Sequence, residues 1–271
     1  MKYCINTAMY NQDLGILEKI KIAAKSGFDA IEPWIYELEN INLKDVVNCC
    51  KDYNIKVSSV EVLYGWFEND GGLMGVENNH QSIMDECKRR IEISKNIESK
   101  FIIAAPSFSH RGFTANWEQG VNYFKEILDL GKSMGCIPSI EFMGQTEQIK
   151  TFELCKSFIN DVGNDATMII DAYHCWKSGG SVYDFDGFDK DRISVLHISD
   201  ADKNIKREDH MDRNRVMILD GQIDLMGFAK TAKKIGFDGF VNVGVYNKSL
   251  WKLNPYDMSE TIINRLNEIF I

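Results

Sequence analysis

The feature that most constrains the fold is a short unit that recurs along the chain: a helix end, a glycine or asparagine, then an apolar strand. Residues 24–32 (AKSGFDAIE) resemble residues 233–241 (KKIGFDGFV). Looser copies lie at residues 51–61, 95–105 and 132–141. A glycine or asparagine commonly ends a helix, and helices that alternate with short strands are typical of an α/β protein with a parallel sheet.

The number of strands narrows the fold further. Residues 2–7 and the apolar runs that end at Asp171 and His197 bring the predicted strands to eight, alternating with helical segments. This profile predicts an α/β fold with a single (β/α)8 TIM barrel, in one domain over residues 1–271. A chain of this length with 44% hydrophobic residues can bury one large core.

A doubly wound open sheet is the main structural alternative, because periodicity cannot show that a barrel closes. However, no Gly-rich phosphate loop follows the first predicted strand, as would be typical of that fold. Amphipathic helices are predicted over residues 13–26, 115–134 (after Thr114 as cap), 224–235 and 257–271.

Charge and composition exclude several classes of function. The 31 Lys and Arg residues against 40 Asp and Glu residues give a net charge of −9, which repels nucleic acid. No stretch approaches the roughly 20 apolar residues that span a bilayer, so no membrane association and a cytoplasmic location are expected. The seven scattered cysteines contain no C-x-x-C pair and are expected to be small buried hydrophobes. The sequence is also compatible with a homo-oligomer.

Three successive predicted strands end in polar groups: Glu141, Asp171 and His197. Parallel strands of a barrel have their carboxyl ends at a common mouth, so these side chains are expected to converge. Two carboxylates and an imidazole suit one divalent ion, Mn²⁺, Mg²⁺, Co²⁺ or Zn²⁺. Each residue alone is explained as well by a strand-end hydrogen bond, but the three together favour a metal site.

Further polar residues follow strand ends. His174, three residues after Asp171, could orient a substrate hydroxyl or cap the following helix. Arg215 could bind an anionic or polyhydroxyl substrate, although a loop arginine is often only solvated. Glu32 and Glu61 end the second and third strands and could line the mouth or form salt bridges.

Aromatic residues could wall a sugar pocket, although packing explains any one of them. Two long connections, residues 62–80 and 199–222, follow the carboxyl ends of strands and are candidate substrate walls. The candidate aromatic residues are Trp34, Trp66, Phe108, Trp176 and Trp251.

Four segments together resemble the sugar-phosphate isomerase/epimerase superfamily: residues 139–144 (SIEFMG), 170–174 (IDAYH), 196–200 (LHISD) and 215–224 (RVMILDGQID). The resemblance extends over nearly the whole chain. It implies a xylose-isomerase-like barrel and is closest to inosose isomerases and ketose 3-epimerases. It also implies that Glu141, Asp171 and His197 are metal ligands, that Glu141 is a general acid/base, and that His174 and Arg215 contact substrate.

The chain departs from this family at the eighth strand. Relatives end it in a pattern like Val-Ser-Val-Glu, whose glutamate is the fourth ligand and the second base, whereas residues 241–244 read VNVG. The internal repeat indicates the same position, because strands two, three and five end in glutamate where strand eight has Gly244. A second departure is Leu219, where relatives usually carry glycine.

Four functions are therefore compared. The first is a metal-dependent isomerase or epimerase of a sugar, sugar phosphate or inosose-like polyol, with altered proton delivery. The second is a lyase or dehydratase that uses Glu141 as its one base. The third is a catalytically impaired sugar-binding descendant. The fourth is an endonuclease with the same barrel, which the net charge opposes and which would need a histidine where Asn214 stands.

Overall fold

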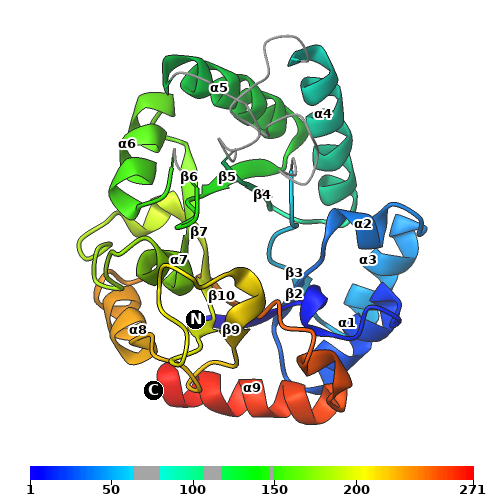
Figure 1. Ribbon diagram of the computed structural model, residues 1–271. Helices are drawn as coiled ribbons and strands as arrows, with labels where there is room; N and C mark the ends of the chain where they lie inside the picture. The colour runs from blue at the N-terminus through cyan, green and yellow to red at the C-terminus, as the bar shows by residue number, and fades with distance from the viewer. Residues whose placement is uncertain (64–79, 107–116, 147–148) are drawn as a thin grey trace.

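The computed structural model describes residues 1–63, 80–106, 117–146 and 149–271. Within them, eight parallel strands form one sheet in the order β3-β2-β1-β10-β7-β6-β5-β4. Figure 1 shows the strands at the centre of a surrounding layer of helices. The strands are β1 (Lys2–Asn6), β2 (Ala30–Glu32), β3 (Lys56–Val57), β4 (Phe101–Ala104), β5 (Ile137–Glu141), β6 (Thr167–Asp171), β7 (Ile193–Ile198) and β10 (Phe240–Val243).

The ends of this sheet meet, so the barrel is closed. Beyond β3, Val60 forms a parallel bridge with Ile102 of β4. The Val60 amide donates to the Phe101 carbonyl (3.1 Å), and the Ile103 amide donates to the Val60 carbonyl (2.9 Å). The predicted (β/α)8 barrel is confirmed, and the open doubly wound sheet is wrong because such a sheet has two unpaired edges.

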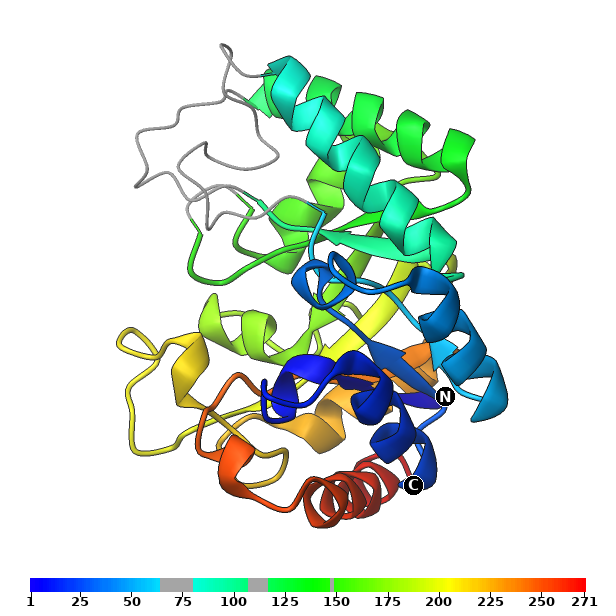
Figure 2. The ribbon, with the colours of Figure 1, turned by 90° about the vertical axis from the view of Figure 1, so that its right-hand side faces the viewer.

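Helices cover the outside of the barrel, and Figure 2 shows residues 199–222, in yellow, on the side opposite both termini. A short antiparallel pair, β8 (Asp200–Ala201) and β9 (Arg215–Val216), frames that segment. No helix among the described residues is long and apolar enough to cross a membrane. The helices are α1 (Ile16–Lys25), α2 (Ile35–Leu38), α3 (Leu43–Asp52), α4 (His80–Asn96), α5 (Trp117–Met134), α6 (Phe152–Val162), α7 (Ala172–Lys177), α8 (Leu225–Lys234) and α9 (Pro255–Ile269).

The recurring sequence unit corresponds to one backbone conformation. In each copy of the unit, a residue one or two positions after the last helical residue has a positive φ angle: Gly27 (96°), Asn54 (51°), Glu98 (61°), Gly135 (85°) and Gly236 (74°). This left-handed residue ends the helix and turns the chain toward the next strand. Glycine and asparagine adopt it readily, which is why they mark the unit in the sequence. The predicted Thr114 cap lies outside the described residues.

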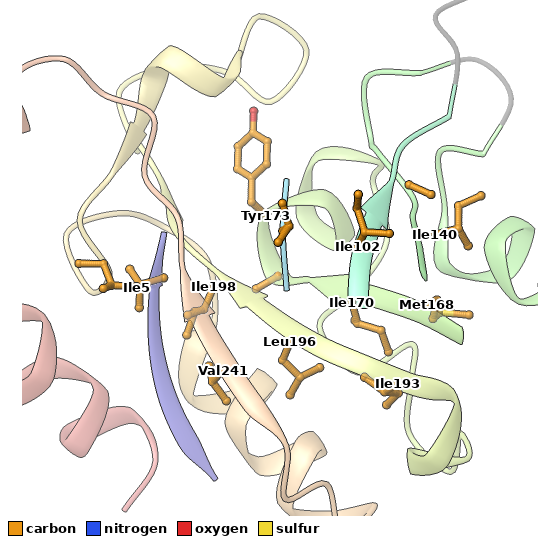
Figure 3. Close-up of a cluster of buried hydrophobic side chains, with 14 of the residues drawn as sticks. Ile5, Ile102, Ile140, Met168, Ile170, Tyr173, Ile193, Leu196, Ile198 and Val241 are labelled. Carbon is orange, nitrogen blue, oxygen red and sulfur yellow. The ribbon is translucent and has the colours of Figure 1, made fainter. Parts of the chain in front are cut away.

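Side chains alternate in direction along each strand, and this alternation separates the residues of the apolar core from those of the site. In β7, Leu196 and Ile198 belong to the large buried apolar cluster, part of which Figure 3 shows, whereas Val195 belongs to a small separate cluster with Ile103 and Ile169. Because neighbouring strand residues face opposite ways, His197 shares the inner face with Val195. The outward apolar residues thus fix the register that brings the polar residues to the barrel mouth.

Candidate metal and substrate site

A cavity of about 310 Å³ opens at the carboxyl ends of the strands. This is the face on which TIM barrels carry their active sites. Seven of the candidate residues line it, and Glu32, also buried, has no exposed surface. Trp66 and Phe108 lie outside the described residues. The lining residues are Trp34, Glu61, Val62, Ile103, Ala105, Glu141, Met143, Asp171, His174, His197, Asp212, Arg215 and Tyr246.

The imidazole of His197 lies between two carboxylates. Its Nδ1 is 3.2 Å from Glu141 Oε1, and its Nε2 is 3.1 Å from Glu32 Oε2. Burial alone would lower the pKa of His197, but attraction to Glu32 and Glu141 outweighs it and raises that pKa well above its usual value. Each ring nitrogen therefore donates to one carboxylate when the imidazole is protonated.

Glu32 holds His197 in place from below. Its carboxylate accepts hydrogen bonds from the Asn6 amide (3.0 Å), the Ser59 hydroxyl and the Asn242 amide. Burial alone would raise the pKa of Glu32, but His197, Ser59 and Asn6 stabilise the charged form and the pKa is lowered. Glu32 was predicted to line the mouth or to form a salt bridge; its ion pair with His197 fixes the orientation of that ring, and a contact with substrate stays a prediction.

A second network surrounds Asp171. This residue caps α7, because its Oδ1 accepts from the Tyr173 amide (2.7 Å), and its Oδ2 accepts from Arg215 Nη1 (3.0 Å). Burial alone would raise the pKa of Asp171, but Arg215, His174 and His197 lower it. The alternative role of His174 as the helix cap is therefore wrong, because Asp171 is the cap.

Arg215 is buried, not solvated. Its guanidinium also donates to Asp212 Oδ1 (2.8 Å) and to the Ser199 hydroxyl (3.1 Å), and it lies over the Tyr173 ring. Its Nη2 is 3.2 Å from His174 Nε2. The connection 199–222 thus contributes Asp212 and Arg215 to the pocket wall. The alternative interpretation, in which Arg215 is a solvated loop residue, is therefore wrong.

His174 is fully enclosed at the base of this wall. Its Nδ1 accepts from the Gly144 amide at 3.3 Å. Burial lowers the pKa of His174, so its imidazole is neutral near pH 7. A neutral imidazole in the lining can hydrogen-bond a hydroxyl group without adding charge to the pocket.

Of the candidate aromatic residues that the structure describes, Trp34 alone lines the cavity. Its indole N–H donates to Asn6 Oδ1 (3.0 Å), and its ring meets Tyr246 edge-on at 5.8 Å. Trp176 packs against Tyr173 instead, and Trp251 donates to a backbone carbonyl near the amino terminus. Trp34 therefore presents an apolar ring face, while its polar atom is already bound.

Two residues contribute more than the sequence indicated. Glu61 lines the cavity and accepts from Tyr246 Oη (2.8 Å) and from Asn6 Nδ2 (2.9 Å). Burial, together with repulsion from Glu32 and Glu141, raises the pKa of Glu61 well above its usual value. Tyr246 was not predicted as a site residue, and its position two residues after Gly244 on the chain is the one sequence signal that could indicate it.

The residues fit a divalent ion. Among the described residues, two groups of three have ligand atoms within 4.8 Å of one another: Glu141, Asp171 and His174, and Glu32, Glu61 and His197. The three predicted ligands are divided between these two groups. The contact between Glu141 and His197 joins the groups. Carboxylate oxygens and imidazole nitrogens without thiolates suit Mn²⁺, Mg²⁺, Co²⁺ or Zn²⁺. The assignment of Glu141, Asp171 and His197 as ligands stays a prediction.

Leu219 adopts a backbone conformation that is more usual for glycine. Its φ angle is 72°, in the left-handed region that glycine adopts without cost. A glycine, which the resemblance places there, would meet this requirement freely. Leu219 holds the conformation while its side chain packs against the large apolar cluster. The turn is therefore kept despite the substitution.

A closed (β/α)8 barrel with acidic and histidine side chains converging at its mouth defines the class of protein. The family described as "Xylose isomerase-like TIM barrel" matches residues 20–268, and the chain belongs to this family. The family resemblance seen in the sequence is thereby confirmed.

Individual relatives are distant in sequence but match nearly the whole chain. An inosose isomerase of Bacillus velezensis is 23% identical over 270 residues, which cover 96% of this chain and 94% of the relative. The crystal structure of the IOLI protein with a zinc atom has a TM-score of 0.88 at 22% identity, covering 100% of this chain and 98% of that one. A D-allulose 3-epimerase of Methylomonas sp., in complex with D-allulose, has a TM-score of 0.79 at 14% identity, covering 99% and 96%.

Proposed function

We propose that the protein is a divalent-metal-dependent isomerase or epimerase that acts on a sugar, sugar phosphate or inosose-like polyol. The observation that carries the proposal is the buried pair of Glu141 and His197, 3.2 Å apart, in the same cavity as Asp171. The inosose isomerase and the D-allulose 3-epimerase among the relatives support this substrate class, and the zinc atom of the IOLI structure supports a metal.

Glu141, Asp171 and His197 would hold the metal. When bound there, a divalent ion polarises the carbonyl and hydroxyl oxygens of a substrate and so acidifies the C–H bond between them. Asp171 is kept ionised by Arg215, and Glu32 orients the His197 ring. These contacts orient the side chains of the proposed ligands.

Glu141 is the proposed base. Its carboxylate lines the cavity, so it can take the proton from the acidified carbon and return it. When the proton returns to the neighbouring carbon on the same face, and the hydroxyl proton of that carbon passes to the former carbonyl oxygen, the product is an isomer; one carboxylate then suffices for the carbon-to-carbon transfer. Epimerisation requires a proton from the opposite face, and Gly244 supplies no group for that step.

The charges around the pocket favour a neutral polyhydroxyl substrate over a phosphorylated one. Arg215 is the only Arg or Lys in the lining formed by described residues, and Asp171 and Asp212 already balance its charge. Neutral His174 and the ring of Trp34 offer a hydrogen bond and an apolar face. The cavity volume of about 310 Å³ also suits a small ligand.

A one-base lyase or dehydratase is the second candidate, because the strand that would bring the opposing carboxylate ends in Gly244. Incubating the Mn²⁺-loaded protein with ketoses, their phosphates and inososes, followed by NMR of the products, separates the candidates. An isomer or epimer supports the proposal, a dehydrated product supports the lyase, and unchanged sugar supports a binding protein. Absence of bound metal after Mn²⁺ is supplied would overturn both enzymatic functions.

A further inference from the structure

The inner face of β10 continues to Gly244. The Asn242 amide of this strand donates to Glu32 inside the barrel, so the residue two positions on has the same orientation. A Cβ atom on Gly244 would lie 3.5 Å from Tyr246 Oη and 3.7 Å from Asn6 Cβ, which are ordinary contacts. A side chain at position 244 would therefore extend toward Tyr246 and Asn6.

A carboxylate from another strand end already occupies that neighbourhood. Glu61 Oε1 accepts from Tyr246 Oη (2.8 Å) and from Asn6 Nδ2 (2.9 Å), the same two residues that a side chain at position 244 would meet. Glu61 lines the cavity, and its carboxylate forms a group with Glu32 and His197 whose ligand atoms lie within 4.8 Å.

Asn6 fixes the direction of these contacts. Its Oδ1 accepts from the Ala8 amide (2.9 Å) and from the Trp34 indole N–H (3.0 Å), so its Nδ2 must face the carboxylates of Glu32 and Glu61. The side chain of Glu61 is thus held at the mouth by two donors from separate strand ends. Both of these hydrogen bonds are to Glu61 Oε1.

We propose that Glu61, four residues beyond β3, supplies to the metal site the carboxylate that Gly244 does not provide. The inference rests on the proposed metal centre of Glu141, Asp171 and His197 and adds a fourth ligand to it. Tyr246 and Asn6 are positioning residues that hold Glu61. In this proposal a carboxylate reaches the same space from the segment after β3 instead of from the segment after β10.

The test is the affinity for Mn²⁺ alone, measured by calorimetry on the full chain, so no substrate is required. Glu61→Gln keeps an oxygen for Tyr246 and Asn6 but removes the charge, and we expect its affinity to fall by at least about tenfold. In the double variant Glu61→Gln/Gly244→Glu, a new carboxylate enters the same space, and we expect most of the affinity to return. Glu153→Gln, on an exposed helix turn, is the matched control and should bind as the unmodified chain does.

The outcomes separate this inference from the proposed function. If Glu141→Gln weakens Mn²⁺ binding and Glu61→Gln does not, Glu61 is only a structural acceptor and the inference is overturned. If neither variant weakens binding, the metal centre itself is wrong. Should Glu61→Gln fail to fold, Tyr246→Phe removes one of the two donors to Glu61; it is expected to lower the affinity severalfold, and unchanged affinity would contradict the inference.

Discussion

His197 Nδ1 lies 3.2 Å from Glu141 Oε1, and this contact joins two groups of candidate ligands into one site. The residues come from β7 and β5, which are separated in the sheet by β6. Glu32 reaches the other nitrogen of the same ring from β2. The imidazole is thereby fixed in orientation.

Metal binding should release protons. Glu32 and Glu141 face His197, with Asp171 also nearby, and they raise its pKa well above the usual value, so the ring carries a proton near pH 7 that a metal must displace. Affinity for Mn²⁺ should therefore rise with pH. Calorimetry in two buffers of different ionisation enthalpy should show release of about one proton or more per ion. Equal heats in both buffers, with affinity independent of pH, would show that His197 is not displaced.

Removing the charge of Glu32 should act through His197. The variant Glu32→Gln removes the largest attraction that raises the pKa of His197, so this pKa should fall. Loss of the orienting contact should weaken Mn²⁺ binding by about 10–100-fold. NMR titration of the imidazole, together with calorimetry, measures both effects. An unchanged His197 titration would mean that Glu32 does not control the ring.

Arg215 should matter for stability as well as for substrate binding. The variant Arg215→Ala leaves Asp171 buried without its ion-pair partner and should lower the free energy of unfolding by about 3–5 kcal/mol. The neighbouring Arg213 is exposed, so Arg213→Ala should change it by less than about 0.5 kcal/mol. Urea denaturation of both variants compares them directly. Equal stabilities would contradict a buried structural pair.

The fold was largely predictable because its signals are local. Short apolar runs and the turn residues Gly27, Asn54, Gly135 and Gly236 mark where helices end and strands begin, and the structure places strands there. Glu98 has the same backbone conformation without the usual residue type, so it carried no signal. Closure of the barrel depends on the pairing of Val60, which lies beyond β3, with β4. No local sequence pattern encodes this pairing.

The site was predictable only in part. Convergence of Glu141, Asp171 and His197 followed from the rule that parallel strand ends share one face. The contact between Glu32 and His197 joins residues 165 positions apart and depends on the curvature of the closed barrel. Burial of Arg215 depends on how residues 199–222 fold back to Asp171, which the sequence of that segment does not reveal.

The central claim is proton abstraction from a sugar or inosose by Glu141, and solvent deuterium exchange tests it most directly. The Mn²⁺-loaded protein is incubated in D₂O with ketoses and inososes, and deuterium at the carbon beside the carbonyl is measured by NMR. We predict incorporation with at least one substrate, reduced about 10²–10⁴-fold in Glu141→Gln. No incorporation across the panel, with metal shown to be bound, would contradict the claim.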